Sequence, residues 1–451
     1  MSLKKRSSEF SVVHPHAAGI DIGATFHVVA VSPEFDPNPV REFKSFTTDL
    51  HRLSRWLRDV GVTSVAMEST GVYWIPIFEI LESDGFEVIL VNARDVKQVP
   101  GRKTDYNDAQ WLQKLHQFGL LRASFRPSEH IASLRAYMRH RERLIEYAAA
   151  HIQHMQKALM QMNVQLHHVV RDITGVTGMR IIRAIICGQR DAAGLATYRD
   201  VRCKESEATI AAALTGNYRD EHIFGLKQAV ELYDFYQELI NKCDKEIEKS
   251  VAKLNHQKKT PDNPLPKARH KTRQRHEPDF AVRDALYTFT GVDITQINGF
   301  GPYTALRLIG ECGSDMSKWP TEKHFTSWLC LSPGNKKSGG KILSQKTMST
   351  KSRASTLLRI AAVNVGKTDT ALGAFYRRLA ARVGKAKAVI ATARKLAILF
   401  YSLLKNGGIY VERGAAHYEE QYRNRVIINL KKRAKRLGYD LVTQPPSIEV
   451  S

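Results

Sequence analysis

The stretch AAGIDIGATFHVVAVS, residues 17–32, decides the fold of the first part of the chain. It contains two apolar runs that meet at a glycine-containing turn, which is typical of two paired β-strands. Strand and helix signals then alternate up to about residue 125. The further predicted strands are 41–48, 63–70 and 86–93, and the predicted helices are 50–60, 73–85 and 105–119. Strand runs followed by such alternation predict an α/β domain with a mixed sheet over residues 17–125.

The next segment has a different period. Apolar residues recur at alternating spacings of three and four over about five heptads, with one polar break at Arg141, and this pattern indicates a coiled coil. The first seam consists of Ile131, Leu134, Met138, Ile145, Ala148, Ile152, Met155, Leu159, Met162 and Leu166. A weaker seam consists of Leu226, Val230, Tyr233, Ile240, Ile247, Val251 and Leu254. Three arrangements remain open: a hairpin within one chain, pairing between chains, or an ordinary pair of long core helices.

Composition divides the rest of the chain. Residues 255–279 are rich in Pro, Lys, Arg and His with almost no apolar residues, which predicts a disordered basic linker or insertion able to touch nucleic acid. The expected organisation is a basic tail at 1–16, the α/β domain at 17–125, a helical or coiled-coil region at 126–254, the linker at 255–279, a mainly helical domain at 280–411 and a basic tail at 412–451.

The charge balance indicates the kind of partner. Lys and Arg number 68 against 45 Asp and Glu, a net charge of +23, and such an excess favours polyanionic partners. No apolar run approaches the roughly 18–20 residues that span a membrane, and no signal peptide is recognised at the start. The five cysteines form no CxxC pair, which favours reduced thiols and a cytoplasmic location over a disulfide framework or zinc site.

Four carboxylates in the first domain form a candidate metal site. Asp21 lies inside a strand between Ile20 and Ile22, where an ionised group is costly unless it has a partner or a metal. Glu68 ends a later strand, and Asp105 and Asp108 share one face of a helix at its start. Such a set can hold two Mg²⁺ ions about 4 Å apart for phosphodiester cleavage. Taken alone, Asp105 and Asp108 would more often be helix-capping residues.

Two glycine-rich turns precede apolar helices. The sequences DITGVTGMRIIRAIICG (172–188) and QINGFGPYTALRLIGECG (296–313) each resemble half of a helix-hairpin-helix element. In such an element the backbone N–H groups at the helix start hold a DNA phosphate. Gly299 and Gly301 of the second copy are therefore candidate nucleic-acid contacts.

The segment NKKSGGKILS, residues 335–344, has three interpretations: a phosphate-cradling loop, a plain basic turn, or a strand end presenting Ser338. A P-loop requires Gly-x₄-Gly-Lys-Ser/Thr, but from Gly334 the Lys position is Gly340 and the hydroxyl is missing. Ser344, Ser349 and Ser352 are alternative hydroxyls nearby. His151 and His154, three residues apart, suggest a metal pair, although a place on the surface or seam of the helix explains them better.

Several of these motifs together resemble a known family. The sequences GIDIGATFHVVAV, AMESTGVYW, VNARDVKQVPGRKTDYNDAQWL, INGFGPYTALRLIGECG and LSPGNKKSGGK are similar to those of the DEDD-type insertion-sequence transposases, the IS110 family. The SGGK form is most similar to the IS1111 group. The resemblance covers about residues 17–125 and 290–400.

This resemblance implies a RuvC-like domain of the RNase H fold, with Asp21, Glu68, Asp105 and Asp108 as a Mg²⁺-binding catalytic tetrad. It also implies a C-terminal transposase domain in which Ser338 is the nucleophile. The family's partners would be donor and target DNA and a non-coding guide RNA, the bridge RNA. The expected assembly is a dimer that forms a tetramer, with active sites built from different protomers.

Two features depart from the family pattern: residues 255–279, and MSTKSRASTLLR after the serine. The candidate nucleic-acid contacts are Lys336, Lys337, Gly339, Gly340, Lys341, Lys351, Arg353, Arg359, Gly299 and Gly301. The resulting hypothesis is a recombinase that cuts and rejoins DNA. The alternatives are a RuvC-like, structure-selective, Mg²⁺-dependent endonuclease that uses water, in which Ser338 is only a turn residue, and a non-enzymatic nucleic-acid-binding scaffold.

Overall fold

The computed structural model describes residues 11–92, 105–255, 263–269, 273–350 and 352–442. The side chains of residues 105–107 and of Lys336 are outside this description. The chain divides into two compact units, residues 1–126 and residues 127–451.

The first unit contains one five-stranded sheet with the strand order β3-β2-β1-β4-β5. Its strands are β1 (Ala17–Ile22), β2 (Phe26–Ala30), β3 (Val40–Lys44), β4 (Ser64–Glu68) and β5 (Glu87–Val91). The first three strands pair antiparallel, whereas β1–β4 and β4–β5 pair parallel. The sheet is therefore mixed, as the sequence predicts.

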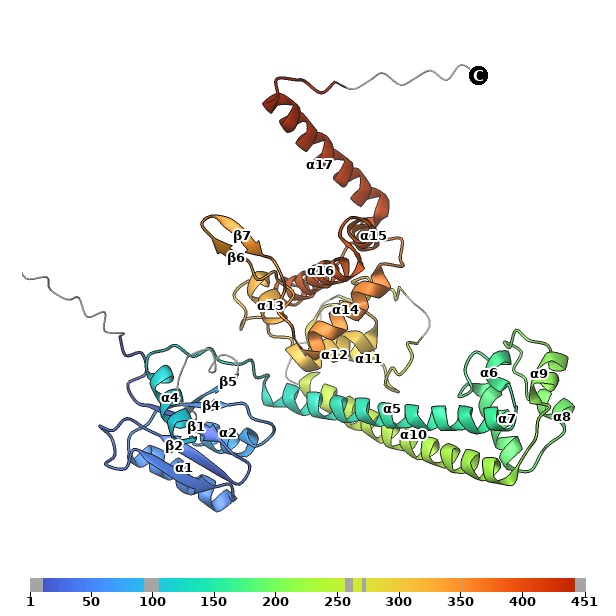
Figure 1. Ribbon diagram of the computed structural model, residues 1–451, viewed down its shortest axis with the longest axis horizontal. Coiled ribbons are helices and arrows are strands. Elements are labelled where there is room, and N and C mark those ends of the chain that lie inside the picture. Colours follow the sequence, from blue (N-terminus) through green and yellow to red (C-terminus); the bar gives the residue numbers. More distant parts are fainter. Residues whose placement is uncertain (1–10, 93–104, 256–262, 270–272, 351, 443–451) are drawn as a thin grey trace, which may run out of the picture. The chain divides into compact units, whose positions relative to one another are not determined.

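Helices cover both faces of this sheet (Figure 1). Because side chains alternate along a strand, Val29 and Val31 join the core under α1 (Thr47–Asp59) and α2 (Trp74–Ser83). Val28 and Ala30 point the other way and pack with Ala109 of α4 (Asp105–Gln117). The layers and the strand order are consistent with an RNase H-like domain, as expected from the sequence.

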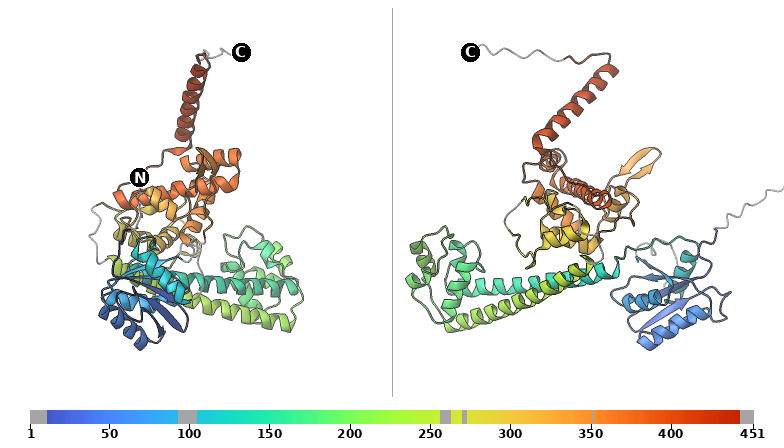
Figure 2. Two further views of the ribbon diagram at one scale, coloured as in Figure 1. Left: turned by 60° about the vertical axis from the view of Figure 1, so that its left-hand side comes forward. Right: turned by 180° about the vertical axis from the view of Figure 1, so that it is seen from behind.

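Two long helices dominate the start of the second unit. Helices α5 (Glu129–Gln161) and α10 (Asp220–Asn255) lie side by side along most of their length (Figures 1 and 2). They run antiparallel, since Leu144 packs with Ile240 in one cluster and Met155 packs with Leu226 in another. The two predicted seams thus meet within one chain. Arg141, the polar break in the first seam, is buried between them.

Four short helices close one end of this helix pair: α6 (Leu166–Val169), α7 (Val176–Ile186), α8 (Ala192–Ala196) and α9 (Glu207–Leu214). Their apolar side chains share a core with the adjoining ends of α5 and α10.

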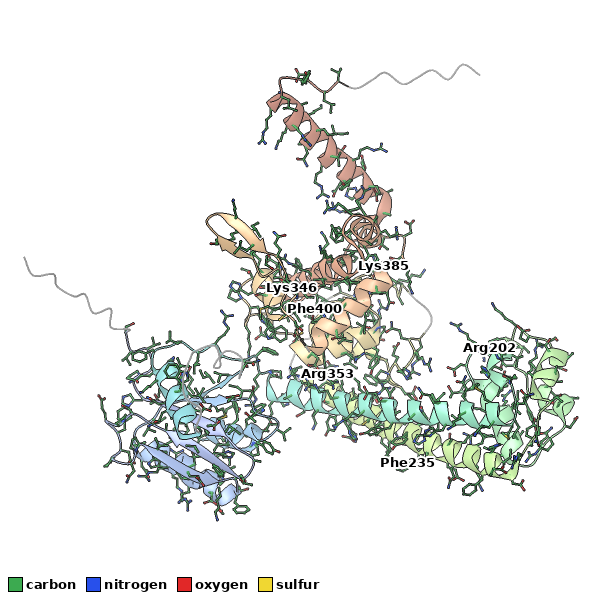
Figure 3. The ribbon with its side chains drawn as sticks, viewed as in Figure 1. Arg202, Phe235, Lys346, Arg353, Lys385 and Phe400 are labelled. Carbon is green, nitrogen blue, oxygen red and sulfur yellow. The ribbon has the colours of Figure 1, made fainter. Side chains whose placement is uncertain are left out.

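The rest of the second unit is mainly helical. Its elements are α11 (Val282–Thr290), the short 3₁₀ helix η1 (Ile294–Gln296), α12 (Pro302–Cys312), α13 (Glu322–Trp328), the hairpin β6 (Lys336–Ser338) and β7 (Lys341–Ser344), α14 (Arg353–Val365), α15 (Ala371–Val383), α16 (Lys385–Asn406) and α17 (Gly414–Arg436). An aromatic cluster of Trp319, Phe325, Trp328, Phe400 and Tyr401 joins α13 to α16. Phe400 is fully buried there (Figure 3).

Part of the basic segment 255–279, predicted as a disordered linker or insertion, makes defined contacts. Backbone carbonyls in the described residues 263–269 accept hydrogen bonds from the helical domain. Tyr287 donates to the carbonyl of Asn263 at 2.7 Å, and Arg283 donates to that of Pro266 at 2.5 Å. Polar contacts of this kind need no apolar residues, which is why hydrophobic patterning does not reveal them.

Two further predictions concern the membrane and the thiols. None of the helices in the described part of the chain is long and apolar enough to cross a membrane. All five cysteines are free thiols.

Candidate functional site

Asp21 and Glu68 lie at the same level of the sheet, on the neighbouring strands β1 and β4. The parallel register pairs Ile20 of β1 with Met67 of β4, and each acid is the next residue of its strand. Both side chains are half-buried, whereas the preceding residues Ile20 and Met67, which point to the opposite face of the sheet, are fully buried. Each carboxylate therefore stands at the edge of the apolar core, where it remains accessible from the carboxyl ends of the parallel strands.

Hydrogen bonds fix the chain just beyond Glu68. The backbone N–H and the hydroxyl of Ser69 both donate to the carbonyl of Val91, at 3.0 and 3.1 Å. The N–H of Thr70 returns to the carbonyl of Glu68 at 2.9 Å. The position of Glu68 is thus set by both β4 and β5.

Helix α4 runs antiparallel to β1 and β4, and this direction brings its first turn to the edge that carries Asp21 and Glu68. At the opposite edge, His116 near the end of α4 hydrogen-bonds to Ser64 at the start of β4, at 2.7 Å. The carbonyl of Gln117 there accepts from the N–H groups of Val13 and His14. The start of α4, with Asp105 and Asp108, consequently lies at the carboxyl edge of the strands.

Gly19 allows α4 to approach this closely. A Cβ on Gly19 would lie 2.3 Å from the backbone nitrogen of Gln113 and 2.4 Å from the carbonyl oxygen of Ala109. The helix backbone therefore rests directly on β1, two residues before Asp21. This contact explains why a glycine precedes the acid and how Asp108, next to Ala109, is held near the strand.

The donor set at this edge suits Mg²⁺. Carboxylate oxygens are the hard ligands that this ion prefers, and a site of few carboxylates leaves room for water and phosphate oxygens. The Asp108 side chain is exposed, and that of Asp105 lies outside the description. Among the described side chains, no group of three or more His, Cys, Asp or Glu is close enough to hold a metal ion. His151 and His154 are only a pair, and their rings meet edge to face with the centroids 5.6 Å apart.

Ser338 is the last residue of β6 in an exposed hairpin. It pairs with Lys341 across Gly339 and Gly340, which have φ of +52° and +76°. A two-residue hairpin turn with both φ positive strongly favours glycine at both places. Strand β7, rather than a helix, follows the turn, so the segment is a β-hairpin and not a P-loop.

The hairpin is both basic and apolar on its surface. Lys337 and Lys341 are exposed beside Ser338, while the side chain of Lys336 and all of Lys351 are outside the described residues. Ile342 and Leu343 are 51% and 69% exposed. A bridge between Pro333 and Thr347 closes the base of the hairpin. The serine thus sits near the tip of a short ribbon with positive charge around it.

Arg353 and Arg359 belong to α14, which follows the hairpin. Arg353, labelled in Figure 3, forms an ion pair with Glu142 of α5 at 2.5 Å, and Glu142 also pairs with Arg307 at 2.5 Å. Within the described part of the chain, the buried Nε of Arg359 has no hydrogen-bond partner. Arg353 therefore already has a structural role, and Arg307 is a basic neighbour of it that sequence reasoning missed. The two are 46 residues apart in sequence, so only the fold brings them together.

Gly299 and Gly301 are packed inside the second unit. Gly299 has φ of +88°, and a Cβ there would lie 2.5 Å from Val365 of α14. Gly301 caps the start of α12, and a Cβ there would clash with Gln274. Close packing and a positive φ are a sufficient reason for Gly299, whereas the Gln274 side chain that meets Gly301 is flexible and can move. Contact with a phosphate remains a prediction.

Two transposase models match the chain. One, the DEDD transposase model of the IS110 type, matches residues 18–164, and the other, of the transposase IS116/IS110/IS902 family, matches residues 291–377. The first match contains all four acids and the second contains Ser338. Together with the RNase H-like sheet, they define a DNA transposase. The chain belongs to the IS110 family of transposases, which confirms the resemblance found in the sequence. No curated protein matches it.

Proposed function

We propose that this transposase cleaves and rejoins DNA strands with Ser338 as the nucleophile and with Mg²⁺ held by Asp21, Glu68, Asp105 and Asp108. The observation that carries the proposal is the common level of Asp21 and Glu68 on neighbouring strands, with α4 beginning at the same edge. That arrangement is what a shared divalent cation requires of its protein ligands.

The serine supplies the covalent step. The Ser338 Oγ forms a bond to the phosphorus, one phosphorus–oxygen bond of the DNA backbone breaks, and the proton lost by the serine balances the one gained by the released deoxyribose hydroxyl. Attack by a second hydroxyl on the phosphoserine reverses these changes and joins the strands without ATP. The bond energy is conserved in the intermediate.

The hairpin supports this role electrostatically. Lys337 and Lys341 flank the serine and stabilise negative charge that develops on the phosphate oxygens. Gly339 and Gly340 carry no side chain, so the backbone beside the serine can approach the phosphate. Mg²⁺, when bound at the acid tetrad, would supply Lewis acidity and lower the pKa of a bound hydroxyl.

The proposed partners follow from the family resemblance and the charge. We infer that a bridge RNA pairs with donor and target DNA, and that the protein acts as a homo-oligomer, a dimer assembling to a tetramer. The net charge of +23 favours binding of both polyanions, the DNA and the RNA. A non-coding RNA that copurifies with the protein is the expected observation; its absence from active protein would contradict this inference.

A strand-transfer assay tests the central proposal. The full chain is incubated with the element's DNA, its RNA and Mg²⁺, and both joined product and protein–DNA adduct are measured. Ser338→Ala is expected to lose both, while the matched hairpin variant Ser344→Ala keeps them. Joined product from Ser338→Ala would contradict the serine mechanism. Cut but unjoined DNA from the wild type would favour the water-dependent nuclease instead.

A further inference from the structure

Helix α17 has no role in the proposed chemistry. Its first half packs on α15: the Tyr418 ring meets Phe375 edge to face at 6.1 Å, and Arg378 lies 3.7 Å over the Tyr422 ring and pairs with Glu419. The C-terminal half of α17 extends away from α15 (Figure 1). None of its residues is buried.

The second half of α17 is strongly basic. Residues 423–436, RNRVIINLKKRAKR, contain seven Lys or Arg and no acid. A favourable interaction with the helix dipole accounts only for the three in the last turn, Arg433, Lys435 and Arg436. The remaining four basic residues need another explanation.

The charge pattern also opposes an isolated helix. Lys431 and Lys435, like Lys432 and Arg436, are four residues apart on the same face, and each like-charged pair costs a few tenths of a kcal/mol. A free-standing segment of about 14 residues is marginal as a helix in water. An anionic partner would remove the repulsion and thus stabilise the helix it binds.

Four of the seven basic residues gather on one side of the helix. At 100° per residue, Arg425, Lys432, Lys435 and Arg436 fall within an arc of about 100°. Val426 and Leu430, 36% and 48% exposed, lie on the opposite side. Arg423, Lys431 and Arg433 lie outside this arc, so the helix has one more strongly basic side, formed by four of the seven basic residues, and further positive charge around the rest of its surface.

We propose that residues 423–436 of α17 bind double-stranded DNA, with the basic side of the helix against the phosphates that border a major groove. The major groove of B-form DNA, about 12 Å wide, admits a single α-helix, whereas the deep and narrow major groove of A-form RNA does not. Charge complementarity and the DNA substrate of a transposase favour this occupant over a second copy of the chain. Residues 423–436 include none of the four acids and not Ser338, so the proposed site contributes affinity and not chemistry.

DNA binding by the full chain tests this inference without any cleavage. Fluorescence anisotropy on a 30-base-pair duplex, between about 0.1 and 0.4 M KCl, is measured for a variant in which residues 431, 432, 433, 435 and 436 are changed to Gln. We expect its affinity at 0.1 M salt to fall at least about tenfold, and the slope of log K against log salt to become less negative by about 3–5. A double variant, Lys432→Gln/Lys435→Gln, is expected to show a smaller loss in the same direction.

The matched control removes five exposed lysines from another helix. Changing Lys227, Lys242, Lys245, Lys249 and Lys253 of α10 to Gln gives the same change in net charge. We expect its salt slope to change by less than about 1. Exchanging Lys for Arg and Arg for Lys at the five α17 positions should preserve binding.

Three results would overturn the inference. One is an equal loss of affinity in the α17 and α10 variants, because net charge alone would then explain it. Another is a loss of affinity for structured RNA with duplex binding unchanged. The third is a change in oligomeric state, measured by light scattering, with duplex binding unchanged, which would assign α17 to a second copy of the chain. These outcomes are independent of whether Ser338 is the nucleophile.

Discussion

Arg141 of α5 and Asp244 of α10 form an ion pair buried inside the helix pair, with side chains only 3% and 6% exposed. The Arg141 Nη2 lies 3.3 Å from the second oxygen of Asp244, in addition to the contact made by its Nε. Asp244 also accepts from the N–H of Asp279 at 3.1 Å, and Arg141 donates to the carbonyl of His276 at 2.8 Å. The pair therefore holds the basic segment 273–279 against the two long helices.

Removing one partner of this pair should destabilise the protein strongly. Asp244→Asn leaves the Arg141 charge buried without its counter-charge, and we expect a loss of about 3–5 kcal/mol in the free energy of unfolding, measured by urea denaturation. The control is the exposed pair of Lys249 and Glu246 on the same helix, where Lys249→Ala should leave the urea denaturation midpoint nearly unchanged. Similar small losses in both variants would contradict the structural role assigned to the buried pair.

Gly19 should tolerate no side chain. In Gly19→Ala the new Cβ meets backbone atoms of α4, which cannot rotate away, so the strand or helix must shift. We expect a loss of about 1–3 kcal/mol of stability and reduced Mg²⁺-dependent cleavage, since α4 carries Asp105 and Asp108. Gly225→Ala in α10 is the control, because a Cβ there meets nothing within 4 Å. Unchanged stability and activity in Gly19→Ala would show that α4 does not rest on β1 in this way.

His116 should make stability depend on pH. Burial, with a smaller contribution from the charge of His14, lowers the pKa of His116 to about 4. Between about pH 6.5 and 4 the unfolded chain therefore holds a proton that the folded chain does not, and stability falls as the pH falls through this window. The loss from pH 7.5 to 5.0 should be about 2 kcal/mol smaller in His116→Gln than in the wild type, by urea denaturation. An unaltered loss in His116→Gln would refute the assignment.

The acid tetrad should control cleavage and not DNA binding. Asp21→Asn and Glu68→Gln remove a formal charge from the proposed Mg²⁺ site, and we expect strand cleavage to fall at least about 10²-fold. Chelation with EDTA should abolish cleavage in the wild type, and added Mg²⁺ should restore it. Asp59→Asn, at the end of α1, is the control of equal charge. Cleavage within about threefold of the wild type in both tetrad variants would refute the metal site.

The sequence predicts the first unit well because its strands have clear apolar runs and its helices are bounded by glycines. The sequence could not predict that Asp21 and Glu68 lie at the same level of the sheet. This alignment depends on the parallel register of β1 and β4, which no local sequence pattern contains. Arg141, a break in a heptad seam, became intelligible only with Asp244 beside it, 103 residues later in the chain. The basic C-terminal segment likewise shows no helical spacing of apolar residues. Residues 414–436 nevertheless form a helix, because the Ala, Glu, Lys and Arg residues in this segment each have a high helix propensity.

Mapping the covalent intermediate to one residue tests directly whether Ser338 is the nucleophile. After reaction with DNA, RNA and Mg²⁺, the adduct is digested with nuclease and trypsin and analysed by mass spectrometry. Trypsin cleavage after Lys337 and Lys341 releases the peptide Ser338–Lys341. If Ser338 is the nucleophile, we expect this peptide to carry a nucleotide on the Ser338 hydroxyl. A nucleotide on any other residue, or joined DNA formed with no protein adduct at all, would contradict it.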